Sequence, residues 1–326
     1  EGDEYDTAFF DKGPKFLHYR PTQVLLTSVE FDHADIYRDL EHVKSAFRRL
    51  LQIIPETGGL IANLDFPTVV ELTREFQRRA VSYAIRPEHR EAADYFAEIL
   101  AADGQTRFRI HSRLSAPEGW EVNWNIPGAH NVSNALGVTA LAFRLGLSWE
   151  EIRRGLETFQ GVKRRQDLLG EVGGILVIDD FAHHPTAVQE TVTAIRKKFP
   201  KRRLWAIFEP RSNSSKRDVF QQDYPPSFAA ADRVLLADVF MPEKVKDGKV
   251  LDVASIVQSI NAAAGTAKAA HLSGTEKMMA FLKSEARAGD VLLFMSNGGF
   301  GGLQQKVLEA LRAEENKGLS GNKYVI

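Results

Sequence analysis

The sequence predicts an α/β protein of two domains, the second of which contains a doubly wound parallel sheet. Its 326 residues are more than one ordinary domain holds. From about residue 170 onward, short apolar runs alternate with amphipathic stretches of about 10–15 residues, the pattern of a parallel sheet with crossover helices. Polar residues follow several of these runs, and ligands bind at the carboxyl ends of such strands.

The first half mixes short strands and helices. A helix over 131–145 is strongly predicted, because its apolar residues recur on one face and Gly146 ends it. Ser148 is expected to cap the helix that follows. The runs 107–111 and 121–125 alternate apolar and polar residues, as strands with one solvated face do. Further strands are expected at 23–28 and 59–63, and further helices at 37–51 and 68–78.

The second half is more regular. The domain boundary is predicted within 155–170, and we place it between domains 1–162 and 163–326. Pro185 suits the first turn of a helix over 185–199, whose apolar residues form one stripe. Strands are expected at 175–178, 204–208, 234–237, 267–271 and 291–295, and the other helices at 253–263, 276–286 and 302–312.

The composition excludes several classes of protein. The chain has no cysteine, which rules out disulfides, zinc–thiolate sites and a cysteine nucleophile. Its formal net charge of −1 gives no support for non-specific nucleic-acid binding. No apolar run approaches the roughly 18 residues of a membrane helix and no signal peptide is visible, so we expect a cytoplasmic protein without membrane contact. The sequence contains no P-loop, G-x-S-x-G elbow or H-E-x-x-H motif, which leaves a simple hydrolase or zinc enzyme without support.

The stretch 179–185, DDFAHHP, places two acids and two imidazoles directly after a buried strand. Asp180 is suited to accept a hydrogen bond from a ribose hydroxyl. His183 is suited to donate to a phosphate or to move a proton near neutral pH. For His184, capping of the following helix and a chemical role are equally open.

Arg211, with Ser212 and Asn213, follows the next strand. Its guanidinium can grip a carboxylate or a phosphate through two parallel hydrogen bonds. The alternative is an ordinary surface arginine. A second basic group, 161–165, includes Arg165 and suits phosphate charge, with a solvated linker as its alternative.

The first half offers two further polar groups. Glu1 and His33 carry oxygen and nitrogen donors of the kind that hold Mg²⁺ near phosphates, although a lone histidine before a helix is more often a cap. His130, Asn131 and Asn134 open a strongly predicted helix, where they can hydrogen-bond a nucleobase. Simple N-capping by Asn131 is the alternative.

Six stretches, taken together and in order, resemble the Mur ligase family. The resemblance spans the whole chain and implies an α/β architecture in which part of a central ATPase domain precedes a Rossmann-like C-terminal domain. The family also has an N-terminal UDP-binding domain and a P-loop, so the resemblance implies that these lie upstream and that this chain alone is inactive. The stretches are 1–12, 30–37, 128–134, 161–165, 179–185 and 208–213.

The family resemblance implies ATP and Mg²⁺ as cofactors. ATP phosphorylates the lactoyl carboxylate of UDP-N-acetylmuramate and an amine attacks the acyl phosphate, so catalysis is mainly positioning and charge stabilisation. Carried over by motif, the implied catalytic residues are His183 and Arg165, and the implied metal ligands are Glu1 and His33. Implied ATP contacts are His130, Asn131, Asn134, Arg165 and Asp180. Implied substrate contacts are Arg211, Ser212, Asn213 and His184.

Phe181 and Ala182 distinguish two branches of the family. Members that add L-alanine usually have Tyr-Gly at these positions and a different arginine loop after the next strand. The resemblance therefore implies a ligase that joins L-Ala-γ-D-Glu-meso-diaminopimelate to UDP-N-acetylmuramate in peptidoglycan recycling. An L-alanine-adding ligase and a non-catalytic muropeptide-binding module stay open as alternatives.

Overall fold

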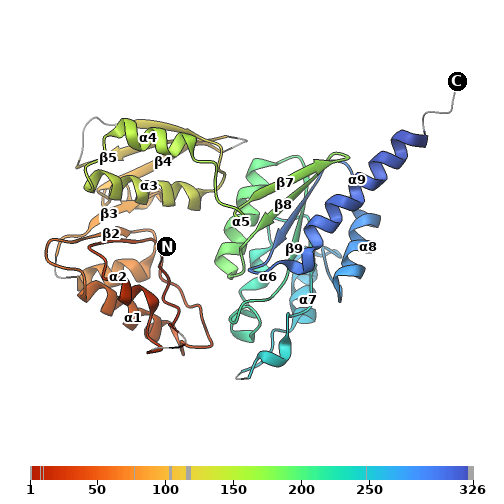
Figure 1. The fold of residues 1–326 in the computed structure, drawn as a ribbon, viewed down its shortest axis with the longest axis horizontal. Coiled ribbons are helices and arrows are strands. Elements are labelled where there is room, and N and C mark those ends of the chain that lie inside the picture. Colours follow the sequence, from red (N-terminus) through yellow and green to blue (C-terminus); the bar gives the residue numbers. More distant parts are fainter. Residues whose placement is uncertain are drawn as a thin grey trace. The chain divides into compact units, whose positions relative to one another are not determined.

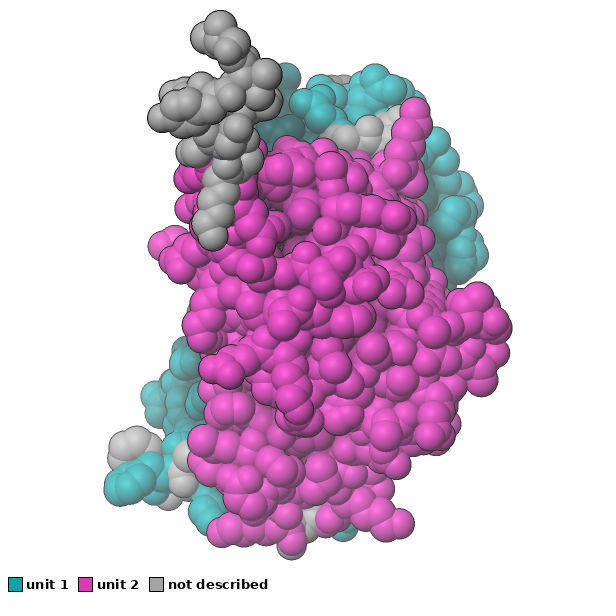
Figure 2. All heavy atoms as spheres, turned by 90° about the vertical axis from the view of Figure 1, so that its right-hand side faces the viewer, with its two compact units in different colours: residues 1–160 teal, residues 161–326 magenta. Residues whose placement is uncertain are grey.

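The computed structural model divides the chain into two compact units, residues 1–160 and 161–326 (Figure 2). The structure describes residues 2–7, 9, 11–76, 78–102, 105–114, 119–246 and 248–321, with side chains up to residue 316. Each unit has its own sheet, helices and buried core (Figure 1). The predicted α/β class is confirmed.

Unit 1 contains a mixed six-stranded sheet with the order β1-β2-β3-β4-β5-β6. The first four strands pair in parallel, whereas β4, β5 and β6 pair antiparallel. Strands β3 and β4 are absent from the sequence prediction. The strand bounds are Gln23–Leu26 for β1, Gly59–Asn63 for β2, Val81–Ala84 for β3, Tyr95–Ala102 for β4, Thr106–Ser112 for β5 and Trp120–Trp124 for β6.

The helices of unit 1 are held by caps and by close packing. Ser148 and Glu151 form a capping box at the start of α4, which confirms the predicted cap. A Cβ on Gly137 would lie 2.9 Å from side-chain atoms of Leu25 and Tyr83, so this glycine lets α3 approach the sheet. The helix bounds are Leu40–Gln52 for α1, Pro67–Glu75 for α2, Ala129–Arg144 for α3 and Trp149–Thr158 for α4.

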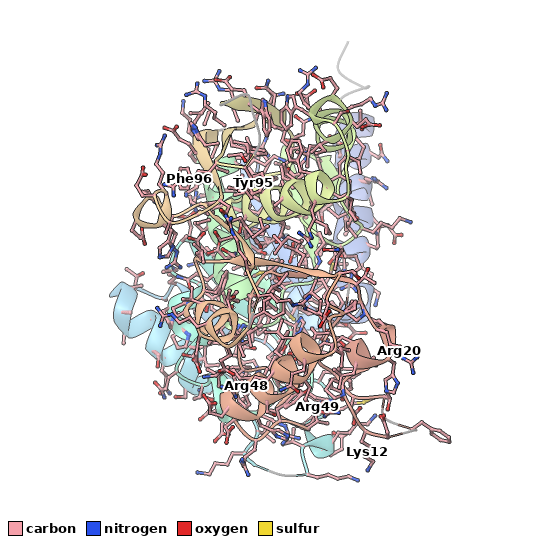
Figure 3. The ribbon with its side chains drawn as sticks, turned by 90° about the vertical axis from the view of Figure 1, so that its left-hand side faces the viewer. Lys12, Arg20, Arg48, Arg49, Tyr95 and Phe96 are labelled. Atoms are coloured by element: carbon pink, nitrogen blue, oxygen red, sulfur yellow. The ribbon has the colours of Figure 1, made fainter. Side chains whose placement is uncertain are left out.

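Ion pairs join α1 to α2. The buried Lys44 ammonium lies 2.7 Å from Oε2 of Glu71, and Nε of Arg48 lies 2.8 Å from Oε2 of Glu75. Arg48 is labelled on the ribbon of α1 in Figure 3. Beneath these pairs, α1 and α2 share an apolar core with β1 and β2. Helices α3 and α4 share a second core with β3 to β6 and with Leu25 and Ile61 on the other face of β1 and β2. The sheet of unit 1 is therefore covered on both faces at β1 and β2, whereas β5 and β6 expose alternate residues on one face, as the sequence predicted.

Unit 2 contains a six-stranded sheet with the order β11-β10-β9-β12-β8-β7. All neighbouring strands are parallel except β7, an edge strand that pairs antiparallel with β8. This edge strand was not predicted, but the doubly wound parallel sheet was, and that prediction is confirmed. The strand bounds are Asp167–Val172 for β7, Ile175–Asp180 for β8, Arg203–Phe208 for β9, Arg233–Leu236 for β10, Ala269–His271 for β11 and Asp290–Met295 for β12.

Two groups of helices cover the sheet of unit 2 (Figure 1). Helices α5, α6 and α7 pack in sequence against one another, and α8 packs against α9. The last helix continues beyond the predicted 302–312. Within the described ranges, every helix is too short or too polar to cross a bilayer. The helix bounds are Pro185–Lys198 for α5, Tyr224–Ser227 for α6, Val253–Ala264 for α7, Thr275–Glu285 for α8 and Leu303–Gly321 for α9.

The carboxyl ends of four strands of unit 2 lie along one edge of the sheet. Met295 at the end of β12 pairs in register with both Asp180 of β8 and Phe208 of β9, and Phe208 pairs with Leu236 of β10. The loops that follow these strands therefore begin side by side. This is the edge where doubly wound sheets bind ligands.

Candidate functional site

The buried Asp179 and the half-buried Arg164 form an ion pair at this edge. Nε of Arg164 donates to Oδ2 of Asp179 at 3.0 Å, and Nε2 of Gln304 donates to the other oxygen at 3.2 Å. Burial raises the pKa of the Asp179 carboxyl, while Arg164 and Gln304 hold back part of that rise. The carboxyl therefore depends on Arg164 to carry its charge.

Arg164 also holds the loop that follows β12. Its Nη2 donates to the backbone oxygens of Ser296 and Gly298, both at 2.6 Å. The neighbouring Arg165, predicted from the sequence, has an exposed side chain whose guanidinium carbon lies 5.3 Å from the centre of the Phe181 ring. Arg164 was thus missed. The Arg-Arg pair signalled a functional arginine but not which of the two pairs with Asp179.

Asp180 holds the backbone that follows Arg165 and the backbone of its own loop after β8. It is 3% exposed, and its two oxygens accept hydrogen bonds from the backbone amides of Gln166 and Ala182, both at 2.7 Å. Arg164 and Gln166 have left-handed backbones with φ of 60° and 54°, which is strained for residues with a Cβ. The hydrogen bond from the amide of Gln166 to Asp180 helps to offset this strain, and it fixes the backbone next to Arg165. The contact between Asp180 and a ribose stays a prediction.

The two histidines of the DDFAHHP stretch have different surroundings. Nδ1 of His183 donates to the carbonyl oxygen of Phe181 at 3.0 Å, which puts the acceptor lone pair of the neutral ring on Nε2. Nδ1 of His184 accepts from the backbone amide of Thr186 at 3.3 Å, so this ring caps α5, and it packs edge-on against Phe220. The chemical role of His183 and the substrate contact of His184 stay predictions.

Arg211 lies where three loops meet. Its guanidinium carbon is 3.6 Å from the centre of the Phe240 ring, and its Nη1 is 3.7 Å from Oε2 of Glu209. That same oxygen of Glu209 accepts a 2.6 Å hydrogen bond from Oγ of Ser296. A Cβ on Gly298 would lie 2.0 Å from Nε of Arg211, so a larger residue here would displace the arginine side chain. The loops after β9, β10 and β12 thus converge on one guanidinium.

Ser212 and Asn213 continue the loop after Arg211. Oγ of Ser212 accepts from the backbone amide of Ser215 at 2.9 Å and donates to its hydroxyl at 2.8 Å. These bonds close a local turn that fixes the direction of the loop. Asn213 is exposed. Their predicted substrate contacts stay predictions.

The three predicted adenine contacts lie in the first two turns of α3, in unit 1. Gly128 precedes the helix with a φ of 106°. Nδ2 of Asn131 donates to the backbone oxygen of Pro127 at 2.7 Å, so Asn131 lies inside the helix and the alternative of N-capping by Asn131 is wrong. His130 is half-buried and Asn134 is exposed. Their contact with a nucleobase stays a prediction.

A second polar cluster of unit 1 was not predicted. Nδ2 of Asn63 donates to Oγ of Ser133 on α3 at 3.1 Å. The buried Asp65 accepts from the backbone amide of Ile85 at 2.8 Å and lies 2.9 Å from Nδ1 of His89. These residues follow β2, so the rule that polar residues gather after parallel strands would have found them.

His33 lies beside Glu4. Nε2 of His33 is 3.8 Å from Oε1 of Glu4, and its ring meets the edge of Tyr5 at 4.6 Å. Burial raises the pKa of the Glu4 carboxyl, with a backbone hydrogen bond and His33 opposing the rise. Glu1, the predicted partner of His33, lies outside the described residues.

The fit of a metal ion to these residues is incomplete. Among the residues that the structure describes, no cluster of three or more histidine or acidic side chains is arranged to hold a metal. His33 and Glu4 supply at most two donors, whereas Mg²⁺ takes near-octahedral coordination by oxygen ligands and water. These two side chains alone do not make a complete Mg²⁺ site.

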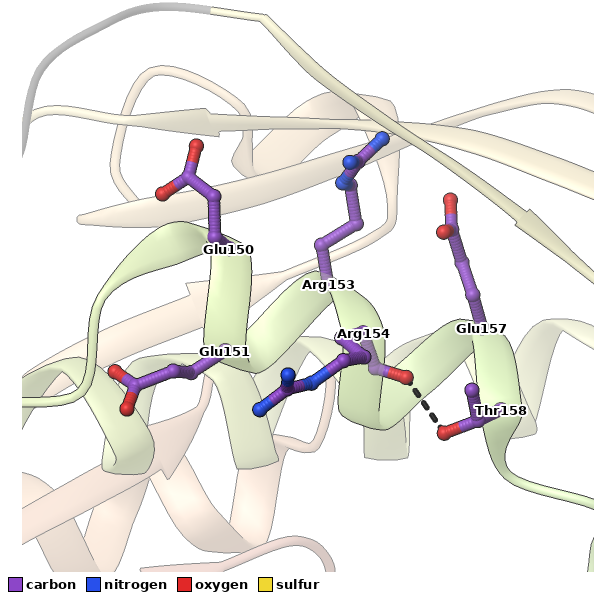
Figure 4. A pocket seen from close by; sticks show the side chains of 6 residues that line it. All are labelled: Glu150, Glu151, Arg153, Arg154, Glu157 and Thr158. Carbon is purple, nitrogen blue, oxygen red and sulfur yellow. Dashed lines mark hydrogen bonds between the residues drawn. The ribbon is translucent and has the colours of Figure 1, made fainter.

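A surface hollow of about 340 Å³ runs along α4 and has no relation to these groups (Figure 4). Its lining comes from one helix, and none of the predicted site residues contributes to it. We therefore assign no function to this hollow. The lining side chains are Glu150, Glu151, Arg153, Arg154, Glu157 and Thr158.

Two family models match the chain. The Mur ligase middle domain matches residues 13–142, and the Mur ligase glutamate ligase domain matches residues 164–298. Together they cover most of the chain. The chain belongs to the Mur ligase family. The resemblance predicted from six short stretches is thereby confirmed.

Individual relatives agree with this family. UDP-N-acetylmuramate–L-alanyl-γ-D-glutamyl-meso-2,6-diaminoheptandioate ligases from Haemophilus influenzae and Escherichia coli K12 are 34% and 35% identical over 96% and 95% of this chain. A UDP-N-acetylmuramate–L-alanine ligase from Salinibacter ruber is 37% identical over 74% of the chain and 48% of the relative. The chain spans 65% and 64% of the length of the first two relatives.

Solved structures show the same architecture. A murein peptide ligase from Psychrobacter arcticus matches with a TM-score of 0.66 and 34% identity, covering 100% of this chain and 63% of that one. A UDP-N-acetylmuramate–alanine ligase from Thermotoga maritima matches with a TM-score of 0.70 at 20% identity, covering 93% of this chain and 65% of that one. The second likeness concerns the fold alone.

Proposed function

We propose that this chain is part of an ATP-dependent ligase that joins L-Ala-γ-D-Glu-meso-diaminopimelate to UDP-N-acetylmuramate in peptidoglycan recycling. The observation that carries the proposal is Arg211, whose guanidinium lies at the ligand-binding edge of the sheet on an aromatic ring. A guanidinium in such a position suits a carboxylate of an incoming peptide. The names of the Haemophilus influenzae and Escherichia coli relatives support this substrate. Because ATP and a nucleotide-linked sugar are the substrates, a cytoplasmic location is part of the proposal.

The proposed reaction has two steps. The γ-phosphoryl group of ATP is transferred to a carboxylate oxygen of UDP-N-acetylmuramate, and ADP leaves. The amine nitrogen of the peptide then attacks the carbonyl carbon of the acyl phosphate, an amide bond forms and inorganic phosphate leaves with the C–O bond electrons. The family uses Mg²⁺, which supplies charge neutralisation at phosphates when it is bound. The protein contributes mainly orientation and charge.

Different residues of this chain would bind the adenine, the phosphates and the peptide. His130, Asn131 and Asn134 at the start of α3 would contact adenine. Arg165, held by Asp180 through Gln166, would stabilise phosphate charge. Arg211 would orient the peptide through its carboxylate, and Ser212, Asn213 and His184 would make further contacts with the substrate. Nε2 of His183 can accept a proton in the neutral ring, which suits removal of the proton that the attacking amine must lose.

An isolated chain of these 326 residues is not expected to catalyse the ligation. The sequence contains no G-x-x-x-x-G-K-[ST] motif, the loop that cradles the phosphates of ATP in such enzymes. Incubation of the chain with ATP, UDP-N-acetylmuramate and the tripeptide should therefore release no phosphate above background. Sustained phosphate release that depends on the tripeptide would refute this.

A substrate competition tests the proposal. The full-length protein encoded by the gene for this chain is offered ATP, UDP-N-acetylmuramate and equal amounts of the tripeptide and L-alanine, and the products are separated by mass. We expect the tripeptide adduct to predominate. A predominant alanine adduct would support the second candidate, an L-alanine ligase, which the relative from Salinibacter ruber favours. Binding of tripeptide without any ATP-dependent adduct would support a non-catalytic muropeptide-binding module.

A further inference from the structure

Arg211 differs from the other half-buried arginines of unit 2. Its side chain is 29% exposed, close to the 24% of Arg196, the 30% of Arg202 and the 23% of Arg203. Each of those three donates hydrogen bonds to protein oxygens. Within the described part of the chain, the side chain of Arg211 donates no hydrogen bond, and its distance of 3.7 Å from Glu209 is too long for one. Its donors are therefore available to a ligand.

Packing, instead of hydrogen bonding, holds Arg211 in place. The 3.6 Å between its guanidinium carbon and the centre of the Phe240 ring is the shortest cation–ring distance among the described pairs. On the Gly298 backbone, a Cβ would meet Nε at 2.0 Å and Cδ at 2.2 Å, so the arginine stem lies directly against this glycine. Stacking on a ring fixes the plane of a guanidinium and leaves its edge donors unused.

The backbone that carries the Phe240 ring is itself held in place. The amide of Phe240 donates to the backbone oxygen of Pro210 at 2.9 Å, which ties the loop after β10 to the residue before Arg211. The next residue, Met241, has a left-handed backbone with a φ of 49°, an unfavourable conformation for a side chain of this kind. A strained residue persists where the surrounding contacts over-determine it. The strain at Met241 therefore indicates that the direction of the Phe240 backbone is tightly set.

We propose that Phe240 and Gly298 are positioning residues that orient the Arg211 guanidinium toward a carboxylate of the incoming peptide. This inference rests on the proposed function, because it takes the peptide as the ligand of Arg211. A guanidinium that is already oriented loses less conformational freedom when the ligand binds. Its two parallel hydrogen bonds to a carboxylate therefore give more affinity. Without the ring, Arg211 can turn toward Glu209, whose carboxylate competes with the ligand.

The sequence offers matched variants for a test. Phe240→Leu removes the ring, and Phe240→Tyr keeps it. Gly298→Ala introduces the 2.0 Å clash with Arg211, whereas Gly299→Ala places its Cβ where no atom lies within 4 Å, at a φ of −79° that alanine adopts readily. Steady-state ligation by the full-length protein gives the KM for the tripeptide and the KM for ATP separately for each variant.

We expect Phe240→Leu to raise the tripeptide KM about three- to thirty-fold, the range that corresponds to a partly desolvated cation–ring contact. Gly298→Ala should act in the same direction. Phe240→Tyr and Gly299→Ala should stay within about twofold of wild type, and the ATP KM should stay within about twofold in all four.

Three outcomes would overturn the inference in distinguishable ways. A wild-type tripeptide KM in Phe240→Leu, combined with a raised one in Arg211→Ala, would show that Arg211 binds peptide without help from the ring. Equal rises in the KM for tripeptide and for ATP in Phe240→Leu would show a general structural effect. Absence of ligation by the wild-type protein would refute the proposed function, and with it the peptide as the ligand of Arg211.

Discussion

Replacement of Arg164 by alanine tests the ion pair that joins the start of unit 2 to its strand ends. The substitution removes the 3.0 Å hydrogen bond to Asp179 and the two 2.6 Å hydrogen bonds to the backbone oxygens of Ser296 and Gly298. Asp179, at 6% exposure, would be left with Gln304 as its remaining side-chain donor among the described residues. We therefore expect unit 2 to lose stability and the loop after β12 to loosen.

The magnitude follows from these contacts. A hydrogen bond to a charged group contributes about 1.5–3 kcal/mol, and breaking a fully buried ion pair costs about 3–5 kcal/mol. The Arg164 side chain is 32% exposed, so water can replace part of what is lost, and we expect a loss of about 2–4 kcal/mol. The adjacent Arg165 is the matched control. It is exposed and lies over Phe181, so Arg165→Ala should cost less than about 1 kcal/mol.

The pKa of Asp179 gives this loss a pH dependence. Burial raises the pKa of this carboxyl in the folded protein above its unfolded value, so its contribution to stability is lost as the pH rises through the interval between the two. Arg164 lowers the pKa of Asp179 in the folded protein. Its removal therefore raises that pKa further above the unfolded value. The loss caused by Arg164→Ala should therefore be smaller near about pH 5, where Asp179 can take up a proton, than near about pH 7.5.

Native-state hydrogen exchange with mass spectrometry is the suitable assay, because two units need not unfold together. Peptides from β8 and β12 report the opening free energy of unit 2, and peptides from β2 and β5 serve as the internal reference. Equal losses in Arg164→Ala and Arg165→Ala, or a loss below about 1 kcal/mol in both, would refute the assignment of Arg164 as the structural arginine.

Three further predictions concern single side chains. Asp180→Ala should raise the KM for ATP about tenfold with the fold retained, since Arg165 loses its backbone support; unchanged ATP kinetics would contradict this. Arg211→Ala should raise the tripeptide KM more than the ATP KM, and equal rises would argue against a peptide contact. Asp65→Ala should cost unit 1 about 2–3 kcal/mol in urea unfolding, because the amide of Ile85 loses a buried partner, and a loss below about 1 kcal/mol would contradict it.

Periodicity predicted the elements that bury a continuous stripe. The helix predicted over 185–199 is α5, Pro185–Lys198, because a proline start and one apolar face determine it locally. Strands β3, β4 and β7 were missed because none of them shows a regular apolar pattern. In β7 the burial pattern is irregular, with Leu168 at 56% exposure, and β3 has only four residues. The strand character of β3 comes from β2 and β4, partners about a dozen or more residues away, which a local pattern does not contain. By contrast, β7 forms a hairpin with β8 across Gly173 and Gly174, a Gly-Gly turn that the sequence does signal.

The residues of the candidate site also divide into those that a local pattern predicts and those that it does not. Polar residues after parallel strands were predictable, because the sheet brings those ends together, and Asp180, His183 and Arg211 were found in this way. Arg164 was not distinguished from Arg165, because the choice depends on two left-handed residues and a carboxylate on another strand. Phe240 was missed because an aromatic residue in a loop carries no local sign of a distant guanidinium.

One isotope experiment tests the central claim, that this chain belongs to an enzyme that activates a carboxylate with ATP and joins it to a peptide. UDP-N-acetylmuramate labelled with heavy oxygen in its lactoyl carboxylate is incubated with ATP, tripeptide and the full-length protein, and the released phosphate is analysed by mass. The proposed reaction predicts one heavy oxygen in each phosphate and a tripeptide-linked product that retains the other. Unlabelled phosphate, or a product that carries alanine in place of the tripeptide, would contradict it.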